Sequence, residues 1–115
     1  MKNAFDVVRD FEEALCEYTG APYCVTTTSC TDALGIAMEY FRPTISLVYM
    51  PKLTYVGVPM QAKRLNYKIE FQDNNWKGMY EIAPLGVYDA ARRFRRGMFK
   101  EMAEKSYTED IYMCL

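Results

Sequence analysis

The most constraining feature of the sequence is a cluster of hydroxyl side chains between a β-prone run and an apolar helical pattern. Residues 26–34 read TTTSCTDAL; residues 23–27 favour a strand, and apolar side chains at helical spacing follow over residues 34–41. A strand that turns into a helix leaves unpartnered N–H groups at the positive end of the helix dipole. Such a turn can bind phosphate, with Ser29 and Thr31 as further donors. The alternative is a plain helix cap, which serine or threonine commonly provides without any ligand.

Composition restricts the classes of protein that fit. The 115 residues, half of them hydrophobic, suffice for one domain with a modest core. The formal net charge of −1 gives no sign of a nucleic-acid partner, and the absence of histidine removes the commonest zinc ligand and general base, so no metal site is expected. The four cysteines form no C-x-x-C pair and follow no secretory signal, which favours a cytoplasmic protein. No apolar run approaches the ~20 residues of a membrane helix, so no membrane contact is expected.

The order of helical and strand-like segments predicts an α/β domain. Helices are expected over residues 5–18, 31–41, 54–65 and 90–103, and strands over 23–27, 45–50, 67–71, 85–88 and 111–115. Residues 74–84 carry turn signals and are expected to be irregular. After the opening helix, this order predicts a mainly parallel sheet with flanking helices. Ligands of such sheets bind at the carboxyl ends of the strands, where the hydroxyl cluster, Tyr55 and Asp89 are expected to lie.

Four segments carry motifs that can be compared with a known family. They are FEEALCEYTG (11–20), TSCTDAL (28–34), MPKLTYV (50–56) and YDAA (88–91). In this order they resemble the F-E-x-x-x-A-x-Y-x-G, N-S-G-T-A-A-L, V-P-x-x-T-[FW]-V and E-D-A-A blocks of the DegT/DnrJ/EryC1/StrS aminotransferases. The resemblance implies part of a fold-type-I, aspartate aminotransferase-like large domain. It also implies pyridoxal phosphate as cofactor and a nucleotide-linked keto-sugar as substrate.

The same resemblance implies which residues bind the cofactor. The phosphate would lie on Ser29, Cys30 (through its backbone) and Thr31. Tyr55 would stack on the pyridine ring, and Asp89 would keep the ring nitrogen protonated so that the ring can accept electrons. Arg92 stands where the family tends to have glutamine or histidine near the phenolic oxygen. The ordinary alternatives are core packing for Tyr55 and a helix N-cap for Asp89.

The family's Schiff-base lysine has no counterpart in the sequence. It belongs to a segment like S-F-H-x-x-K after a strand that residues 111–115 resemble, whereas Lys100 and Lys105 precede this strand. We therefore expect residues 1–115 to be a single truncated large domain without the C-terminal small domain, carrying no catalytic residue and inactive alone. Because an incomplete sheet leaves open edges and apolar faces, we expect a homodimer or a complementing C-terminal chain.

Three other functions are compatible with parts of the sequence. The basic segment Arg92–Lys100, with interleaved phenylalanines, could bind phosphate or nucleic acid, although a solvated helix face is the simpler interpretation and nucleic acid is not expected. A non-catalytic binding or structural module could keep the fold without the cofactor. A thiol enzyme could use Cys30 at a helix start, but no histidine is present to activate it.

Overall fold

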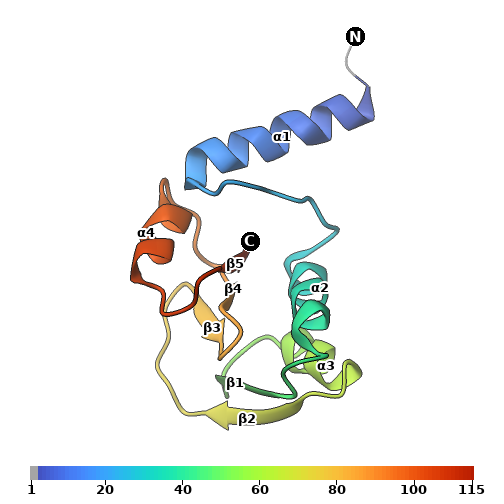
Figure 1. Cartoon of the computed structure of the whole chain (residues 1–115), viewed down its shortest axis with the longest axis vertical. Coiled ribbons are helices and arrows are strands. Elements are labelled where there is room, and N and C mark those ends of the chain that lie inside the picture. Colours follow the sequence, from blue (N-terminus) through green and yellow to red (C-terminus); the bar gives the residue numbers. More distant parts are fainter. Residues whose placement is uncertain (1–2) are drawn as a thin grey trace.

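The computed structural model describes residues 3–115, which form helices and strands (Figure 1). The elements are α1 (Ala4–Thr19), α2 (Cys30–Phe41), β1 (Leu47–Pro51), α3 (Gly57–Arg64), β2 (Lys68–Gln72), β3 (Tyr80–Ile82), β4 (Val87–Asp89), α4 (Met98–Lys105) and β5 (Tyr112–Cys114). The predicted α/β class is confirmed. Within the described part of the chain, no helix is both long and apolar enough to cross a membrane.

The strands form two groups joined by a backbone bridge. β1 and β2 are parallel, and β4 lies between β3, which is antiparallel to it, and β5, which is parallel to it. Tyr49 of β1 and Ala83 after β3 exchange N–H···O bonds of 2.8 and 3.1 Å. Two of these three strand pairs are parallel, as the sequence predicts. The antiparallel pair arises because β3 forms in the segment that was expected to be irregular.

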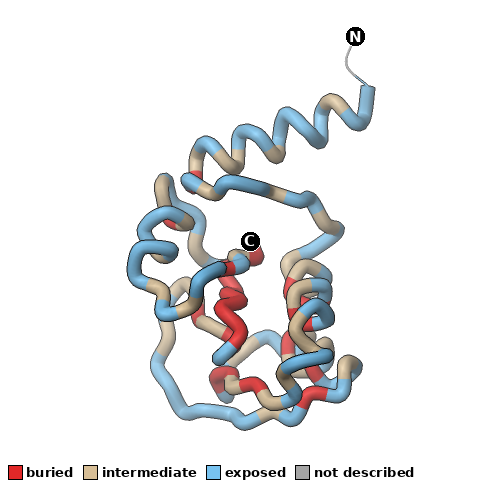
Figure 2. Tube along the Cα trace, in the orientation of Figure 1, coloured by how far each residue is buried: buried red, intermediate tan, exposed pale blue. Residues whose placement is uncertain are grey.

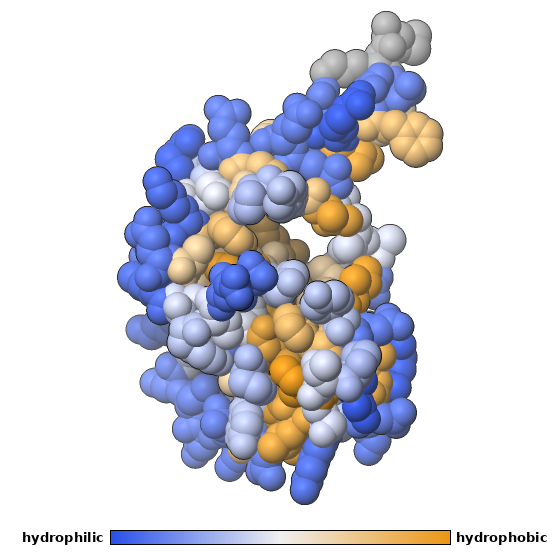
Figure 3. All heavy atoms as spheres, in the orientation of Figure 1, coloured by the Kyte–Doolittle hydropathy of each residue, from blue (hydrophilic) through white to orange (hydrophobic). Residues whose placement is uncertain are grey.

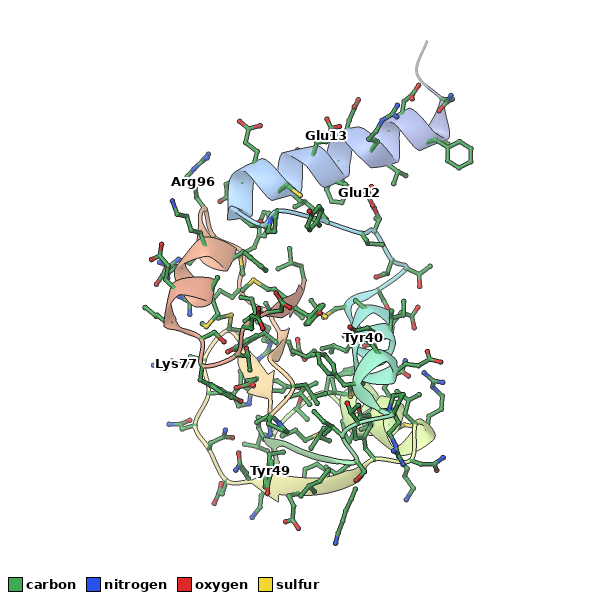
Figure 4. All side chains as sticks on the ribbon, in the orientation of Figure 1. Glu12, Glu13, Tyr40, Tyr49, Lys77 and Arg96 are labelled. Atoms are coloured by element: carbon green, nitrogen blue, oxygen red, sulfur yellow. The ribbon has the colours of Figure 1, made fainter. Side chains whose placement is uncertain are left out.

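Residues 23–27 do not form the strand that the sequence predicts. They are extended, pair with no strand among the described residues, and expose Tyr23 and Val25 by 87% and 81%. Their backbone is tied to α1 instead, because the amide and hydroxyl of Thr26 both donate to the Glu12 carboxylate at 2.7 Å. Glu12 points from α1 toward this segment, whereas Glu13 points away from it (Figure 4). A β-prone run becomes a strand only where a neighbouring strand completes its hydrogen bonds.

The basic helix expected over residues 90–103 begins only at Met98. Turns precede it: the amide of Arg93 donates to the carbonyl of Ala90 at 3.1 Å, and the amide of Gly97 donates to the carbonyl of Tyr18 at 2.7 Å. Gly97 has a φ of +71°, a left-handed conformation that glycine adopts at little cost and that interrupts a helix. Residues 92–96 therefore lie outside any helix, and their arginines do not share the helix face that the sequence predicts.

The apolar core lies between the helices α2 and α3 and the strands β1, β3 and β4 (Figure 2). Its most buried members are Leu34, Met38, Val48, Met50, Val58, Ala62, Ile82 and Val87. α1 stands outside this body, with Phe5 84% exposed. Its C-terminal end is anchored to the body, where Tyr18 packs on Phe94 with ring centroids 4.9 Å apart. Apolar side chains of α1 are visible at the surface in Figure 3.

Candidate functional site

A cavity of about 520 Å³ lies near the start of α2 and the end of β4. Its lining comprises Cys30, Thr31, Leu34, Leu53, Thr54, Tyr55, Val58, Trp76, Gly78, Asp89, Ala91 and Arg92. These residues include five of the six side chains that the sequence singles out for a cofactor, and Ser29 is the one that is not among them. The volume is typical of a pocket for a small organic ligand. Three separate parts of the chain therefore contribute predicted site residues to one cavity.

The N-terminus of α2 lies at the cavity, because Cys30 and Thr31 belong to its lining. Ser29 is the N-cap, and its hydroxyl accepts a 3.1 Å hydrogen bond from the amide of Asp32. The amides of Cys30 and Thr31, in the first turn, have no acceptor within the helix. The helix cap and phosphate binding are thus compatible. Ser29 accepts the hydrogen bond of the Asp32 amide, and the two earlier amides stay available as donors at the positive end of the helix dipole.

Tyr55 and Thr31 approach each other over Gly57. A Cβ atom on Gly57 would lie 3.1 Å from the Tyr55 ring and 3.2 Å from the methyl group of Thr31. Tyr55 is 65% exposed, so it is not the core tyrosine that the ordinary alternative supposes. The absence of a side chain at position 57 lets the tyrosine ring and the first turn of α2 line the same cavity. Both are therefore available to a planar phosphorylated ligand.

Asp89 is a buried carboxylate at the end of β4, 9% exposed. Its Oδ2 accepts a 3.1 Å bond from the Tyr80 hydroxyl, and its Oδ1 accepts one of 3.1 Å from the Ala91 amide and a longer one of 3.6 Å from the Cys30 thiol. No helix starts at this point, so the N-cap alternative for Asp89 is wrong. A buried carboxylate with three donors can bind a cationic or N–H group of a ligand.

The neighbours of Asp89 are held in their neutral forms. Burial, followed by the adjacent Asp89 carboxylate, raises the pKa of Cys30 to about 12. Burial also raises the pKa of the Tyr80 phenol above its usual value. A thiol with so high a pKa is a poor nucleophile, which argues against a thiol enzyme at Cys30. Arg92 adds a positive charge to the lining from the turn after β4.

The sequence analysis missed three residues of the site: Thr54, Trp76 and Tyr80. The Tyr80 hydroxyl donates to Asp89 and also hydrogen-bonds Thr54. Trp76 packs edge-on against Tyr80 with ring centroids 4.9 Å apart. The indole N–H of Trp76 donates to the carbonyl of Leu53 at 2.7 Å. Turn signals over residues 74–84 obscured this region, although the alternation of Tyr80, Glu81 and Ile82 was a usable indication of a strand. None of the described residues that line the cavity is a lysine.

An α/β fold with a cavity beside a helix N-terminus is typical of domains that bind phosphorylated small molecules. The family model of the DegT/DnrJ/EryC1/StrS aminotransferase family matches residues 2–98. The chain belongs to this family, so the resemblance found in the sequence is confirmed. Aminotransferases of the family generally depend on pyridoxal phosphate.

Two curated proteins are similar to part of the chain. Both are called UDP-4-amino-4,6-dideoxy-N-acetyl-beta-L-altrosamine transaminase and come from Campylobacter jejuni, of serotypes O:2 and O:23/36. Each is 35% identical over 66 residues, which are 57% of this chain and 18% of the relative. The match therefore spans less than a fifth of the length of these relatives. No solved structure matches the chain significantly.

Proposed function

We propose that residues 3–115 form the cofactor-binding part of a pyridoxal-phosphate-dependent aminotransferase for nucleotide-linked sugars. In this proposal the chain is part of a fold-type-I large domain. The observation that carries it is the convergence of Thr31, Tyr55 and Asp89, which are far apart in the sequence, on one cavity. Membership of the family and the names of the two relatives support the substrate class.

The residues of the cavity fit the chemical groups of the cofactor. The amides of Cys30 and Thr31 would bind the phosphate at the start of α2. The exposed face of Tyr55 would stack on the pyridine ring, and Arg92 would donate to its phenolic oxygen. Asp89 would accept a hydrogen bond from the protonated ring nitrogen and so keep it protonated. When bound, the cofactor supplies an electron sink for the electrons released at the amino-bearing carbon.

Covalent attachment of the cofactor needs a lysine, and the described lining of the cavity contains none. We infer that the lysine comes from a complementing chain or from sequence outside residues 1–115. Purified residues 1–115 with added cofactor and an amino donor should therefore show no transamination. Turnover of the amino donor by this chain alone would contradict the inference.

The open sheet edges and the exposed apolar side chains support self-association or a complementing chain. For the homodimer, light scattering should give a mass near twice the 13.4 kDa of one chain. A measured mass equal to that of a single chain, even in concentrated solution, would contradict the homodimer. Recovery of transamination on adding a separately produced C-terminal segment of the family would instead identify the complementing chain.

Binding of pyridoxamine 5′-phosphate tests the proposed function. This form of the cofactor has no aldehyde and cannot react with surface lysines, so a saturable change in the fluorescence of Trp76, the one tryptophan of the chain, would report the cavity. Asp89→Asn should weaken binding by about tenfold or more, because a charge-assisted hydrogen bond contributes roughly 1.5–3 kcal/mol.

Asp110→Asn is the matched control, because it removes an exposed carboxylate that does not line the cavity. Its affinity should equal that of the wild type. Pyridoxamine without the phosphate should bind much more weakly than the phosphorylated form. Equal affinity of the wild type and Asp89→Asn, or no saturable binding by the wild type, would contradict the proposal.

A further inference from the structure

Tyr80 is a buried side chain behind the cavity lining, where it contacts three residues that line the cavity. Its side chain is fixed from three directions, because Trp76 packs against the ring and the hydroxyl contacts both Thr54 and Asp89. Tyr80 is 6% exposed and belongs to the strand that pairs with β4, directly opposite Asp89 in the register. The backbone pairing and the side-chain hydrogen bond therefore connect the same two residues.

The direction of the hydrogen bonds follows from the chemistry of the groups. An ionised carboxylate can only accept, so Tyr80 gives its single proton to Oδ2 of Asp89. The bond between Thr54 and Tyr80 must then run from the Thr54 hydroxyl to the phenolic oxygen. Because burial raises the pKa of Tyr80, the phenol keeps this proton at neutral pH. Thr54 and Tyr80 therefore form a chain of two donors directed at Asp89.

The two oxygens of Asp89 differ in how many donors they already have. Oδ1 accepts from the Ala91 amide and is also approached at 3.6 Å by the Cys30 thiol, whose single proton is shared with the Cys114 carbonyl at 3.4 Å, whereas Tyr80 is the one donor to Oδ2 among the described residues. Each carboxylate oxygen accepts about two hydrogen bonds. A ring N–H that enters the cavity would therefore find its free acceptor site on Oδ2, the oxygen that Tyr80 holds.

We propose that Tyr80, oriented by Thr54, is a positioning residue that fixes Oδ2 of Asp89 to receive the ring nitrogen of the phosphorylated pyridine. This inference rests on the proposed function. It adds to that function a specific oxygen atom, Oδ2 of Asp89, and the hydroxyl groups of Tyr80 and Thr54. The resemblance to the family assigned none of these three.

Two substitutions remove the hydroxyl chain at different points. Tyr80→Phe and Thr54→Val should each weaken binding of pyridoxamine 5′-phosphate, the first by about tenfold and the second by less, because each removes one donor of a charge-assisted chain. Thr54→Ser keeps the hydroxyl and should restore the affinity of the wild type. In the Asp89→Asn background, Tyr80→Phe should add no further loss, because Tyr80 acts through Asp89.

Tyr67→Phe is the matched control for the loss of a buried tyrosine hydroxyl. Tyr67 is also 6% exposed, but its hydroxyl donates to the carbonyl of Met38, which does not line the cavity, whereas the Tyr80 hydroxyl contacts Thr54 and Asp89, which do. Its ligand affinity should equal that of the wild type even where the protein is less stable to urea. With ligand labelled with ¹⁵N in the ring, the nitrogen signal should show a smaller protonated fraction in Tyr80→Phe than in Tyr67→Phe.

The outcomes separate the inference from the proposed function. Wild-type binding with an unchanged affinity and nitrogen signal in Tyr80→Phe would overturn the positioning role and leave the proposed function standing. An equal loss from Tyr80→Phe in the wild-type and Asp89→Asn backgrounds would also overturn it. No binding by the wild type would overturn both. Should Tyr80→Phe fail to fold, the contrast between Thr54→Val and Thr54→Ser decides the question.

Discussion

Asp89 is the residue on which the chemistry of the cavity depends. A buried carboxylate is costly unless it is hydrogen-bonded, and here an amide, a phenol and a thiol surround it. The family usually has glycine where this chain has Cys30, and the thiol uses the added volume to contact Oδ1 of Asp89. The substitution in the phosphate loop thus has a structural reason at the carboxylate.

The thiol of Cys30 should make stability fall at alkaline pH. Its pKa is raised from 9.0 to about 12 by burial and by Asp89, so between these values the folded chain binds a proton that the unfolded chain has lost. Stability therefore decreases as the pH rises through this window. In Cys30→Ser, urea unfolding at pH 8 to 11 should show a shallower decrease than in the wild type. An identical slope in the two proteins would contradict the assignment.

Gly57 should tolerate no side chain without a change at the ligand site. A methyl group there would meet Tyr55 and Thr31 at 3.1 and 3.2 Å, which is tighter than ordinary contact. Because Tyr55 is exposed and can move away, Gly57→Ala should leave the free energy of unfolding within about 1 kcal/mol of the wild type. Affinity for pyridoxamine 5′-phosphate should nevertheless fall several-fold. Unchanged affinity would show that Tyr55 does not stack on the ring.

At the level of elements, the start of α2 has two separable tasks. Ser29 caps the helix through the amide of Asp32, whereas Cys30 and Thr31, whose amides have no acceptor within the helix, line the cavity. Ser29→Ala should lower the free energy of unfolding by about 1 kcal/mol, and Ser29→Gly by only a few tenths. Urea denaturation measures both. A larger loss from glycine than from alanine would show that the hydroxyl is not a cap.

The elements also show what the sequence could predict. Over residues 5–18 and 31–41 the helical period is long and regular, and the structure has helices there. The buried apolar run of residues 45–50 likewise became β1. These segments carry their own signal, because periodicity and burial coincide within one segment.

The errors occurred where distant contacts decide the local structure. Residues 23–27 have β-prone side chains but no neighbouring strand, and the helix expected from residue 90 is interrupted by bonds to Asp89 and to Tyr18. Tyr80 was overlooked for the same reason, since β3 exists only through its pairing with β4. The family motifs identified the lining of the cavity, but they could not reveal a hydroxyl chain that lies outside them.

On the scale of the whole molecule, the chain consists of a packed body and a helix that projects from it (Figure 1). The extents of 48 × 28 × 25 Å reflect this elongation. α1 contacts the body at its C-terminal end, where Tyr18 packs on Phe94 and lies under the guanidinium of Arg96 at 4.8 Å. Its apolar residues contribute little to the core.

Stability should therefore depend unequally on the apolar residues of α1 and α2. Leu34→Ala should lower the free energy of unfolding by about 2–5 kcal/mol, because Leu34 is 1% exposed and its loss leaves a cavity. Phe11→Ser should change it by less than about 0.5 kcal/mol in the monomer, because Phe11 is 52% exposed. Equal losses in dilute solution would show that α1 packs on the body.

The central claim is that Thr31, Tyr55 and Asp89 form one site for a phosphorylated pyridine. A crystal structure of the chain with pyridoxamine 5′-phosphate tests it most directly. We expect the phosphate on the amides of Cys30 and Thr31, the ring against Tyr55 and the ring nitrogen within hydrogen-bond distance of Oδ2 of Asp89. A ligand bound elsewhere, or a cavity in which Asp89 contacts no part of it, would contradict the claim.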